Sequence, residues 1–456
     1  MPHFGVPKIS GFLGALAFAG LFGALIVLPR RANAVPSYSR QTGLACNACH
    51  TNPPELTPLG RTFKLNGYTM LGLKSITSPS GTGKTGLSLL SFLPLSAQIE
   101  ISDTGLQKAE PATQNWKLSV PQDASIFLAG AYASHLGGFV QVTYNTQDDH
   151  FTWDNTDIRY ANTGHLYGKS LVYGLDINNN PSVEDLWNDT PAWGFPWINS
   201  PSAPGTATSA LVDGQLAQDV GGAGAYTMWN NHLYLAGTVY TSAHLGQPVP
   251  NAGVGSQFNI QNVAPYWRAA WQQSFGNNYL EFGTYGLHVK STPQSVSGPT
   301  DDYTDVAADA QWERVLPQLA NHLLTVHGTY IHESSNLNAT FASGGANFVG
   351  HALNTFRANA EYHIGYRITP ALGYFATTGT NDSLLYAPAS VSGSRTGSPN
   401  SAGFIANVTY WPVQNVRLAL QYTAYTKFNG ASSNYDGMGR NASDNNFLYI
   451  HLGVIF

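Results

Sequence analysis

Residues 445–456, Asn-Asn-Phe-Leu-Tyr-Ile-His-Leu-Gly-Val-Ile-Phe, decide the fold class. Apolar side chains fall on every second position, at Leu448, Ile450, Leu452, Val454 and Phe456. Tyr449, His451 and Gly453 take the positions between them. Such alternation predicts a β-strand with one apolar and one polar face. Apolar-out, polar-in strands are typical of transmembrane β-barrels, and the stretch predicts the last strand of one.

The same period of two recurs along the chain from about residue 95. Sixteen segments carry it, at 95–103, 123–133, 137–146, 151–162, 169–178, 221–230, 231–242, 262–273, 277–290, 301–315, 320–333, 350–363, 365–379, 400–411, 414–427 and 445–456. Short connections such as 230–231 mostly alternate with long ones such as 179–220, as in outer-membrane barrels. An even strand count places both ends of the barrel in the periplasm. The sequence therefore predicts an all-β fold, a 16-stranded antiparallel outer-membrane barrel preceded by a small, mainly helical and loop domain.

Composition agrees with a membrane barrel. Only 10 % of the 456 residues are charged, against about 25 % in typical globular domains. Six tryptophans lie on or beside the predicted strands, where an aromatic girdle requires them: Trp153, Trp229, Trp267, Trp271, Trp312 and Trp411. The alternative is a soluble β-sandwich. The length of the alternating region favours the membrane barrel.

The first 34 residues have the pattern of a secretory signal. Lys8 precedes an apolar run at 11–28, and Ala32-Asn33-Ala34 predicts cleavage before Val35. The alternative is an uncleaved transmembrane anchor. Cleavage removes three basic residues and no acidic one, so the formal charge falls from −5 to −8. A nucleic-acid partner is therefore not expected.

Residues 46–50, Cys-Asn-Ala-Cys-His, contain the only two cysteines of the chain. C-x-x-C-H is the attachment signature of c-type haem, in which both thiols form thioether bonds and the histidine ligates iron. The alternatives are a disulfide or half of a zinc site, but zinc usually needs four ligands. We predict that Cys46, Cys49 and His50 bind one covalent haem c and form the redox centre.

Other side chains near the motif are candidates for completing the haem site. Met70 is the only methionine near the motif and is a candidate distal ligand, which would raise the reduction potential. Alternatively it packs as an apolar residue, and the iron is five-coordinate or bound by a barrel side chain. Arg40, Arg61 and Lys64 are candidates for pairing with the haem propionates. The alternative for these three is a solvated basic surface.

Four carboxylates share one face of the predicted strand 301–315: Asp301, Asp305, Asp309 and Glu313. If that face lines the lumen, hard oxygen ligands form a column that guides ferrous ions. The column equally suits contact with basic residues of an inserted haem segment. The third alternative is an ordinary polar pore wall.

The predicted domains are a signal peptide (1–34), a monohaem c-type cytochrome domain (35–74), a linker rich in Ser, Thr and Gly (75–94) and the barrel (95–456). About 40 residues are too few to form an independent hydrophobic core without a further stabilising link, and a covalently bound haem supplies such a link. Within this domain, Thr57 or Asn52 is expected to cap a short helix that runs through Leu65 and ends at Gly67.

The predicted cytochrome domain resembles a known family. Its matching residues are Pro36, Tyr38, Arg40-Gln41, Cys46-x-x-Cys49-His50, Pro54-Glu55-Leu56-Thr57, Gly60, Phe63-Lys64 and Gly67-Tyr68. This pattern resembles the N-terminus of the outer-membrane fused cytochrome–porins, the iron oxidases of iron-oxidising bacteria. The detailed likeness covers roughly 35 residues, and the remainder agrees in architecture and length.

The resemblance implies a single c-type haem domain associated with a 16-stranded barrel, oxidation of extracellular Fe(II) and transfer of the electron to a periplasmic carrier. We expect the haem domain to lie in or just below the lumen and the carrier to be a cytochrome or a cupredoxin. One alternative is a solute porin of the outer membrane whose haem is structural or sensory. Another is an electron conduit for a different extracellular donor.

Overall fold

The computed structural model describes residues 37–70, 75–77, 88–90, 93–146, 149–243, 259–293 and 297–456. The predicted signal segment lies outside these residues, as does most of the predicted linker. Among the described residues, no helix is both long and apolar enough to cross a membrane. A short hairpin of β1 (Ser75–Thr77) and β2 (Ser88–Leu90) stands apart from the main sheet.

The main sheet is a closed antiparallel barrel of sixteen strands. The strands are β3 (Leu95–Leu106), β4 (Lys117–Ala133), β5 (Leu136–Asn145), β6 (His150–Leu166), β7 (Lys169–Asn178), β8 (Val220–Trp229), β9 (Leu233–Ser242), β10 (Ala264–Phe275), β11 (Asn278–Ser291), β12 (Asp301–Leu316), β13 (His322–Asn336), β14 (Gly350–His363), β15 (Ile368–Gly379), β16 (Ser401–Val413), β17 (Val416–Lys427) and β18 (Phe447–Ile455). Each predicted segment corresponds to one strand, so the predicted barrel and its strand count are confirmed.

The last strand, β18, closes the barrel. It pairs with β3, from Phe447 opposite Leu106 to Ile455 opposite Gln98. Its alternation has the predicted sense, because Tyr449 and His451 point into the lumen and are fully buried, whereas Leu448, Ile450 and Leu452 are partly exposed on the outer face. Elsewhere the outer surface carries large exposed apolar side chains, including Leu175, Phe282, Leu372, Phe404 and Leu420.

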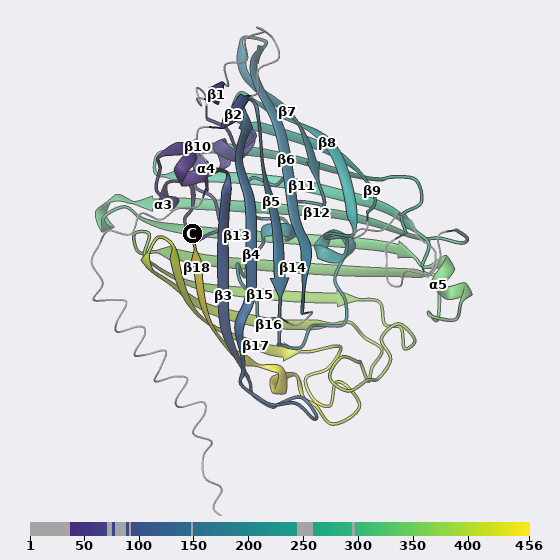
Figure 1. The fold of residues 1–456 in the computed structure, drawn as a ribbon. Coiled ribbons are helices and arrows are strands. Elements are labelled where there is room, and N and C mark those ends of the chain that lie inside the picture. Colours follow the sequence, from purple (N-terminus) through teal and green to yellow (C-terminus); the bar gives the residue numbers. More distant parts are fainter. Residues whose placement is uncertain are drawn as a thin grey trace, which may run out of the picture.

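The two ends of the barrel differ. Turns of a few residues join the strands at one end, where β3 begins and β18 ends. At the other end all connections but one are long, and they include the short helix α5 (Asn338–Ala342). The helices α3 and α4, drawn in purple, lie at the short-turn end, and α5 lies at the opposite end (Figure 1).

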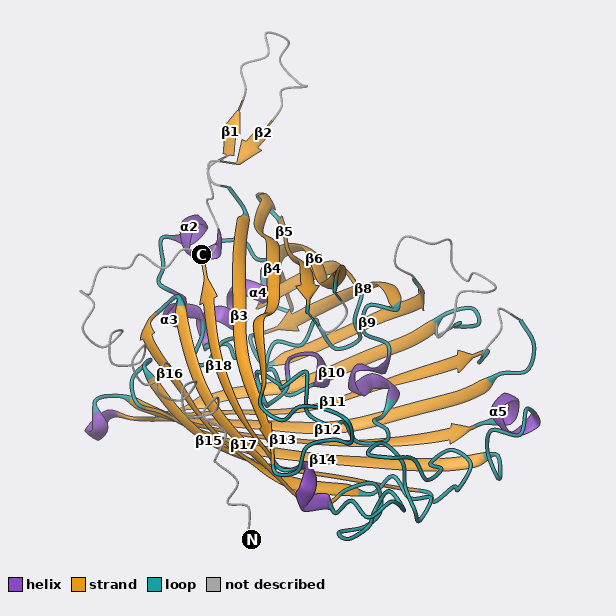
Figure 2. Cartoon of the chain, turned by 60° about the horizontal axis from the view of Figure 1, so that its bottom comes forward, coloured by secondary structure: helices purple, strands orange, loops and turns teal. Residues whose placement is uncertain are grey.

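Two segments occupy the interior. The first, called the plug, is residues 37–70 with helices α2 (Ser37–Thr42), α3 (Cys46–Cys49) and α4 (Pro58–Leu65). The second, called the inward loop, is residues 179–219 between β7 and β8. Helix α4 and loop segments lie within the ring of strands (Figure 2). Leu65 of the plug and Trp187 of the inward loop share one apolar cluster with Tyr226 and Tyr234 of the wall.

Candidate functional site

The Cys46–His50 motif forms a single helical turn at the side of an internal cavity. Cys46, Cys49 and His50 all line that cavity. The Nδ1 atom of His50 lies 3.2 Å from the carbonyl oxygen of Glu55. Donation from a protonated Nδ1 to this oxygen leaves Nε2 as the metal-binding atom. Burial lowers the pKa of His50 and so favours the neutral imidazole that a metal ligand must be.

Local sequence holds this turn against α4. Thr57 is the cap that the structure uses: its Oγ1 accepts from the amide of Gly60 at 3.2 Å and donates to the carbonyl of Ala48 at 2.6 Å. A Cβ atom at Gly60 would lie only 2.2 Å from the Cys49 carbonyl oxygen, so only glycine permits this approach. The predicted helix through Leu65 is confirmed, and it packs directly against the cysteine turn.

The cavity beside the motif has a volume of about 1000 Å³. It is lined by the plug, by β3 to β6, by β16 to β18 with their turn, and by residues 188–199 and 217–219 of the inward loop. Many of its walls are aromatic: Tyr38, Phe63, Tyr68, Phe127, Phe139, Trp153, Trp193, Trp197 and Trp411. Cofactor pockets are mostly apolar clefts of about 300–1,000 Å³ with a few placed polar groups. The volume of the cavity, the two thiols and the oriented imidazole of His50 are together compatible with a haem attached through both cysteines.

Met70, the candidate distal ligand, does not line this cavity, and its side chain is 37 % exposed. Among the described residues that do line it, His50 is the one histidine and no methionine occurs. We therefore expect Met70→Ala to leave the visible spectrum and the reduction potential of the haem unchanged. Removal of a thioether ligand would lower the potential. Visible spectroscopy with potentiometric titration of the purified variant checks this expectation. A fall in the reduction potential would show that Met70 ligates the haem iron.

Two cations of the plug anchor it to its surroundings. Arg61 forms a buried ion pair with Glu313 of β12, with 2.6 Å between Nη1 and Oε1. The Nζ atom of Lys64 donates to the carbonyl oxygens of Val183 and Asp185 in the inward loop, at 2.6 and 2.7 Å. Burial lowers the pKa of Lys64 to about 8. The plug is thus fixed both to the wall and to the loop.

The side chains predicted to meet haem propionates are engaged elsewhere in this structure. Arg40 hydrogen-bonds the carbonyl of Leu95 and does not line the cavity. Lys64 lines the cavity, but its ammonium group is held by the inward loop. Arg417 of β17 also lines it and donates to Glu100 at 2.9 Å. Sequence reasoning missed Arg417, because its position beside the plug depends on closure of the barrel.

The carboxylate column of β12 faces the lumen as predicted, and Asp301, Asp305, Asp309 and Glu313 are all buried. Each carboxylate has a partner from another segment. Asp301 accepts from the backbone amides of Ala339 and Thr340 in α5, and Asp305 accepts from the amide of Val212. Asp309 pairs with Arg268, and Glu313 pairs with Arg61 of the plug. At Glu313 the structure therefore shows the second alternative, contact with a basic residue of an inserted segment.

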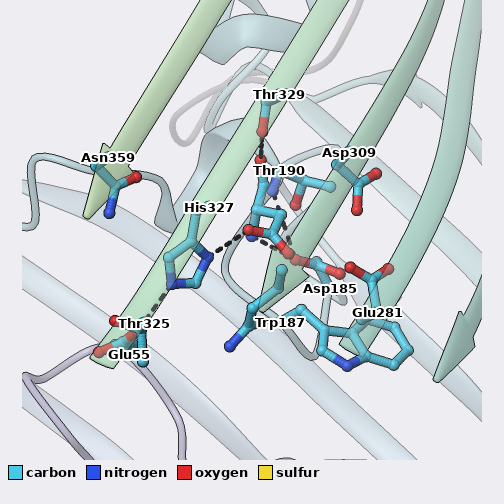
Figure 3. Close-up of polar contacts among 12 residues, drawn as sticks. Glu55, Asp185, Trp187, Thr190, Glu281, Asp309, Thr325, His327, Thr329 and Asn359 are labelled. Atoms are coloured by element: carbon cyan, nitrogen blue, oxygen red, sulfur yellow. Dashed lines mark hydrogen bonds and ion pairs between the residues drawn. The ribbon is translucent and has the colours of Figure 1, made fainter. Parts of the chain in front are cut away.

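His327 of β13 connects the barrel wall to both interior segments. Its Nε2 lies 2.8 Å from Oε1 of Glu55 in the plug, and its Nδ1 contacts the Asp189 carboxylate of the inward loop (Figure 3). Burial acts to raise the pKa of Glu55, but the hydrogen bond and the charges of His327 and His363 lower it to about 2. Sequence reasoning did not find these partners, because they come from segments far from His327 in sequence.

A second buried cluster fixes the inward loop. Arg268 of β10 is within ion-pair distance of Asp185 at 2.8 Å, Asp309 at 2.7 Å and Glu281 at 3.3 Å. All four side chains are buried, and the three carboxylates converge beside Trp187 (Figure 3). One guanidinium therefore compensates carboxylates from the loop and from two strands.

No family model and no curated protein matches this chain. Solved structures similar in shape include the outer membrane channel DcaP of Acinetobacter baumannii, with 12 % identity, a TM-score of 0.46, and coverage of 79 % of this chain and 96 % of that one. An in-vitro folded OmpT of Vibrio cholerae in its trimer form has 10 % identity and a TM-score of 0.45, with coverage of 79 % of this chain and 98 % of that one. OmpF of Salmonella typhi in complex with daunomycin has 13 % identity and a TM-score of 0.43, with coverage of 80 % of this chain and 98 % of that one. The assignment of a closed barrel rests on the strand register of this chain itself.

Proposed function

We propose that this chain is an outer-membrane cytochrome that oxidises extracellular Fe(II) and passes electrons through one c-type haem to a periplasmic carrier. The observation that carries the proposal is the position of the haem motif. Cys46, Cys49 and His50 line an aromatic cavity of about 1000 Å³ inside a closed barrel. A haem held there would lie among aromatic side chains near the short-turn end.

An outer-membrane location follows from the outward side chains. Leu175, Ile177 and Leu372 are about three-fifths or more exposed, and they belong to β7 and β15 on different parts of the barrel wall. Burial of such side chains in lipid is favourable, whereas a continuous apolar belt in water marks an interaction surface. Short turns are periplasmic in such barrels, so the plug lies at the periplasmic end.

The protein's part in this chemistry is binding, orientation and exclusion of water. The two thiols would hold the haem, and the Glu55 carbonyl orients His50 as the ligand. The aromatic walls would keep water from the macrocycle, and Arg417 offers a cation at its edge. When bound, haem supplies a one-electron redox couple whose potential depends on its ligands and surroundings.

The choice of Fe(II) as donor, and of a cytochrome or cupredoxin as acceptor, comes from the family resemblance of the plug sequence. Transfer of electrons alone across the membrane leaves insoluble Fe(III) outside the cell. A one-electron donor also matches a site with a single haem motif, because the chain has only two cysteines.

The second candidate is a solute porin with a structural haem, and the barrel architecture taken alone favours it. It predicts an open, ion-conducting pore. The interior argues against a wide pore, because the plug is bonded to the wall at Glu313 and His327 and the inward loop at Arg268. Conductance in planar bilayers separates the two candidates: the electron conduit predicts little current, and the porin predicts large, stable channels.

Mixing the purified, oxidised protein with Fe(II) under anaerobic conditions is expected to produce the reduced haem α-band. The reaction should be fast compared with reduction of the same protein by a bulky reductant that cannot enter the lumen. The measurement is stopped-flow spectroscopy over a range of pH, with dithionite as the positive control. Reduction by dithionite but not by Fe(II) at any pH would rule out the iron-oxidase proposal and leave haem and barrel intact.

A further inference from the structure

We propose that Glu55 of the plug and Glu361 and His363 of β14 form a binding site for a divalent cation beside the haem cavity. If the proposed function is correct, the cation is the ferrous donor, held there while it loses its electron. The identity of the cation rests on the proposed function, but the site itself does not.

The geometry is that of a preformed ligand set. One ligand atom from each of the three side chains lies within 4.8 Å of the other two. All three side chains are buried, at 2 % exposure or less. Glu361 and His363 are two residues apart on one strand, so both project into the lumen toward the plug. The site therefore exists only when the plug is docked.

The ligand chemistry suits ferrous iron and similar ions. Two carboxylates and one imidazole offer hard oxygen and borderline nitrogen atoms, the types that Fe(II) and Mn(II) accept in proteins. No arginine or lysine is hydrogen-bonded to either glutamate among the described contacts, unlike the cluster at Arg268. A cation at this site would not have to displace a guanidinium.

The buried carboxylates at this site favour a cation. Those of Glu55, Glu361 and Asp189 surround the two imidazoles of His327 and His363. Burial disfavours an ionised carboxylate, so such a group either takes up a proton or pairs with a cation. A divalent ion bound between Glu55 and Glu361 would supply that pairing.

Surrounding donors hold the ligands in place. Asn52 and Trp197 donate to the two oxygens of Glu361 at 3.1 and 2.8 Å. The Nδ1 atom of His363 lies 3.2 Å from the Thr369 hydroxyl, and its Nε2 faces Glu55 at 3.6 Å. Protein metal ligands are characteristically oriented by such outer hydrogen bonds. The Thr325 hydroxyl, 3.2 Å from the same Nε2, occupies the position that a metal ion would take over.

Neighbours of the site line a second cavity. This cavity has a volume of about 390 Å³, runs along β13 to β17 and is lined by His327 and Asn359. His327 contacts Glu55 (Figure 3), and Asn359 donates to Glu361 at 3.3 Å, so one side chain separates this cavity from each glutamate. On the other side, the carbonyl of Glu55 accepts from His50. A single residue thus connects the cation site to the predicted haem ligand.

The electron step is balanced without a proton. An Fe(II) ion at this site becomes Fe(III) by losing one electron, and the oxidised haem gains it. No protein bond forms or breaks. The Fe(III) product would have to leave the site before the next Fe(II) ion could bind.

The test is Mn(II) binding to the haem-loaded, full-length barrel in detergent, measured by loss of the free-ion electron paramagnetic resonance signal. The wild type is expected to bind a single Mn(II) ion tightly. Glu361→Gln and His363→Ala should each weaken binding by at least about tenfold. Glu281→Gln is the matched control: it removes a buried lumen carboxylate from the other cluster and should bind as the wild type does. Compact, heat-modifiable gel migration verifies that each variant has folded.

Equal Mn(II) affinity in the wild type and both site variants would overturn the proposal, as would the absence of any binding by the folded wild type. Reaction with Fe(II) then separates this inference from the proposed function. Undiminished haem reduction by Fe(II) in folded Glu361→Gln would show that the ion bound at this site is not the electron donor, and it would leave the iron-oxidase proposal standing. Tight Mn(II) binding without haem reduction by Fe(II) would support the proposed cation site and refute the proposal that the protein oxidises Fe(II).

Discussion

A chain in which Cys46 and Cys49 are both replaced by alanine is expected to fold as a barrel and to carry no covalent haem. Thioether bonds need thiols, and these two are the only thiols in the sequence. The barrel should survive, because its sixteen strands pair with one another and none of those pairings involves α3. Haem-dependent peroxidase staining after denaturing electrophoresis measures the loss, which is expected to be complete.

The control for this variant is Met70→Ala, which changes an exposed residue of the same plug and should stain as the wild type does. The compact migration of unheated protein on gels reports that the barrel has folded in both. Staining of the double variant at the wild-type level would show that the haem is bound elsewhere or not through these thiols, and the proposed redox centre would then be wrong.

Replacement of Arg268 by methionine is expected to give the largest loss of stability of any single change in the wall. Arg268 is fully buried and lies against Asp185, Glu281 and Asp309. Removing one partner of a buried ion pair costs about 3–5 kcal/mol, because a charge is left without compensation. Here three carboxylates lose their cation together. The inward loop, held through Asp185, should leave the wall and become open to proteases.

The measurements are the temperature at which unheated gel migration is lost and the rate of cleavage within residues 179–219. Lys108→Met is the matched control: Lys108 pairs with Asp444 at 3.3 Å, but it is more than half exposed. Exposed pairs contribute only about 0–1 kcal/mol. A similar unfolding temperature for both variants would mean that the Arg268 cluster carries protons in place of charge, and that the ion pair with Asp185 does not hold the inward loop against the wall.

The sixteen strands could be predicted because a membrane barrel repeats one short-range rule. Alternation places each side chain in lipid or in the lumen, and neither choice depends on distant residues. The largest error in a strand end was at β4, which starts at Lys117 and not near 123. The additional residues include Pro121, and Leu118 and Val120 beside it continue the alternation with exposed side chains.

The candidate haem motif could be recognised for the same reason, since five consecutive residues define it, and the haem itself stays a prediction. The surroundings of that motif could not. Asn52 meets Glu361 across 309 positions of sequence, and Glu55 meets His327 across 272. Such contacts follow from the docked position of the plug, which no local pattern encodes. Met70 is an example of a residue that the sequence suggested and the structure does not support as a ligand. It was a candidate because of its residue type alone, and the structure shows that it lies outside the cavity.

The pairing of β18 with β3 has a consequence for how the molecule is made. The plug precedes every strand of the barrel in sequence, and the seam closes only when the sixteenth strand arrives. In an exported chain the cysteine turn would therefore emerge before the barrel that surrounds it has formed. If the two thiols carry haem as proposed, a rigid macrocycle could reach both sulfur atoms at that stage. The order of biogenesis would then be attachment of the prosthetic group to the open chain, followed by assembly of the barrel around it.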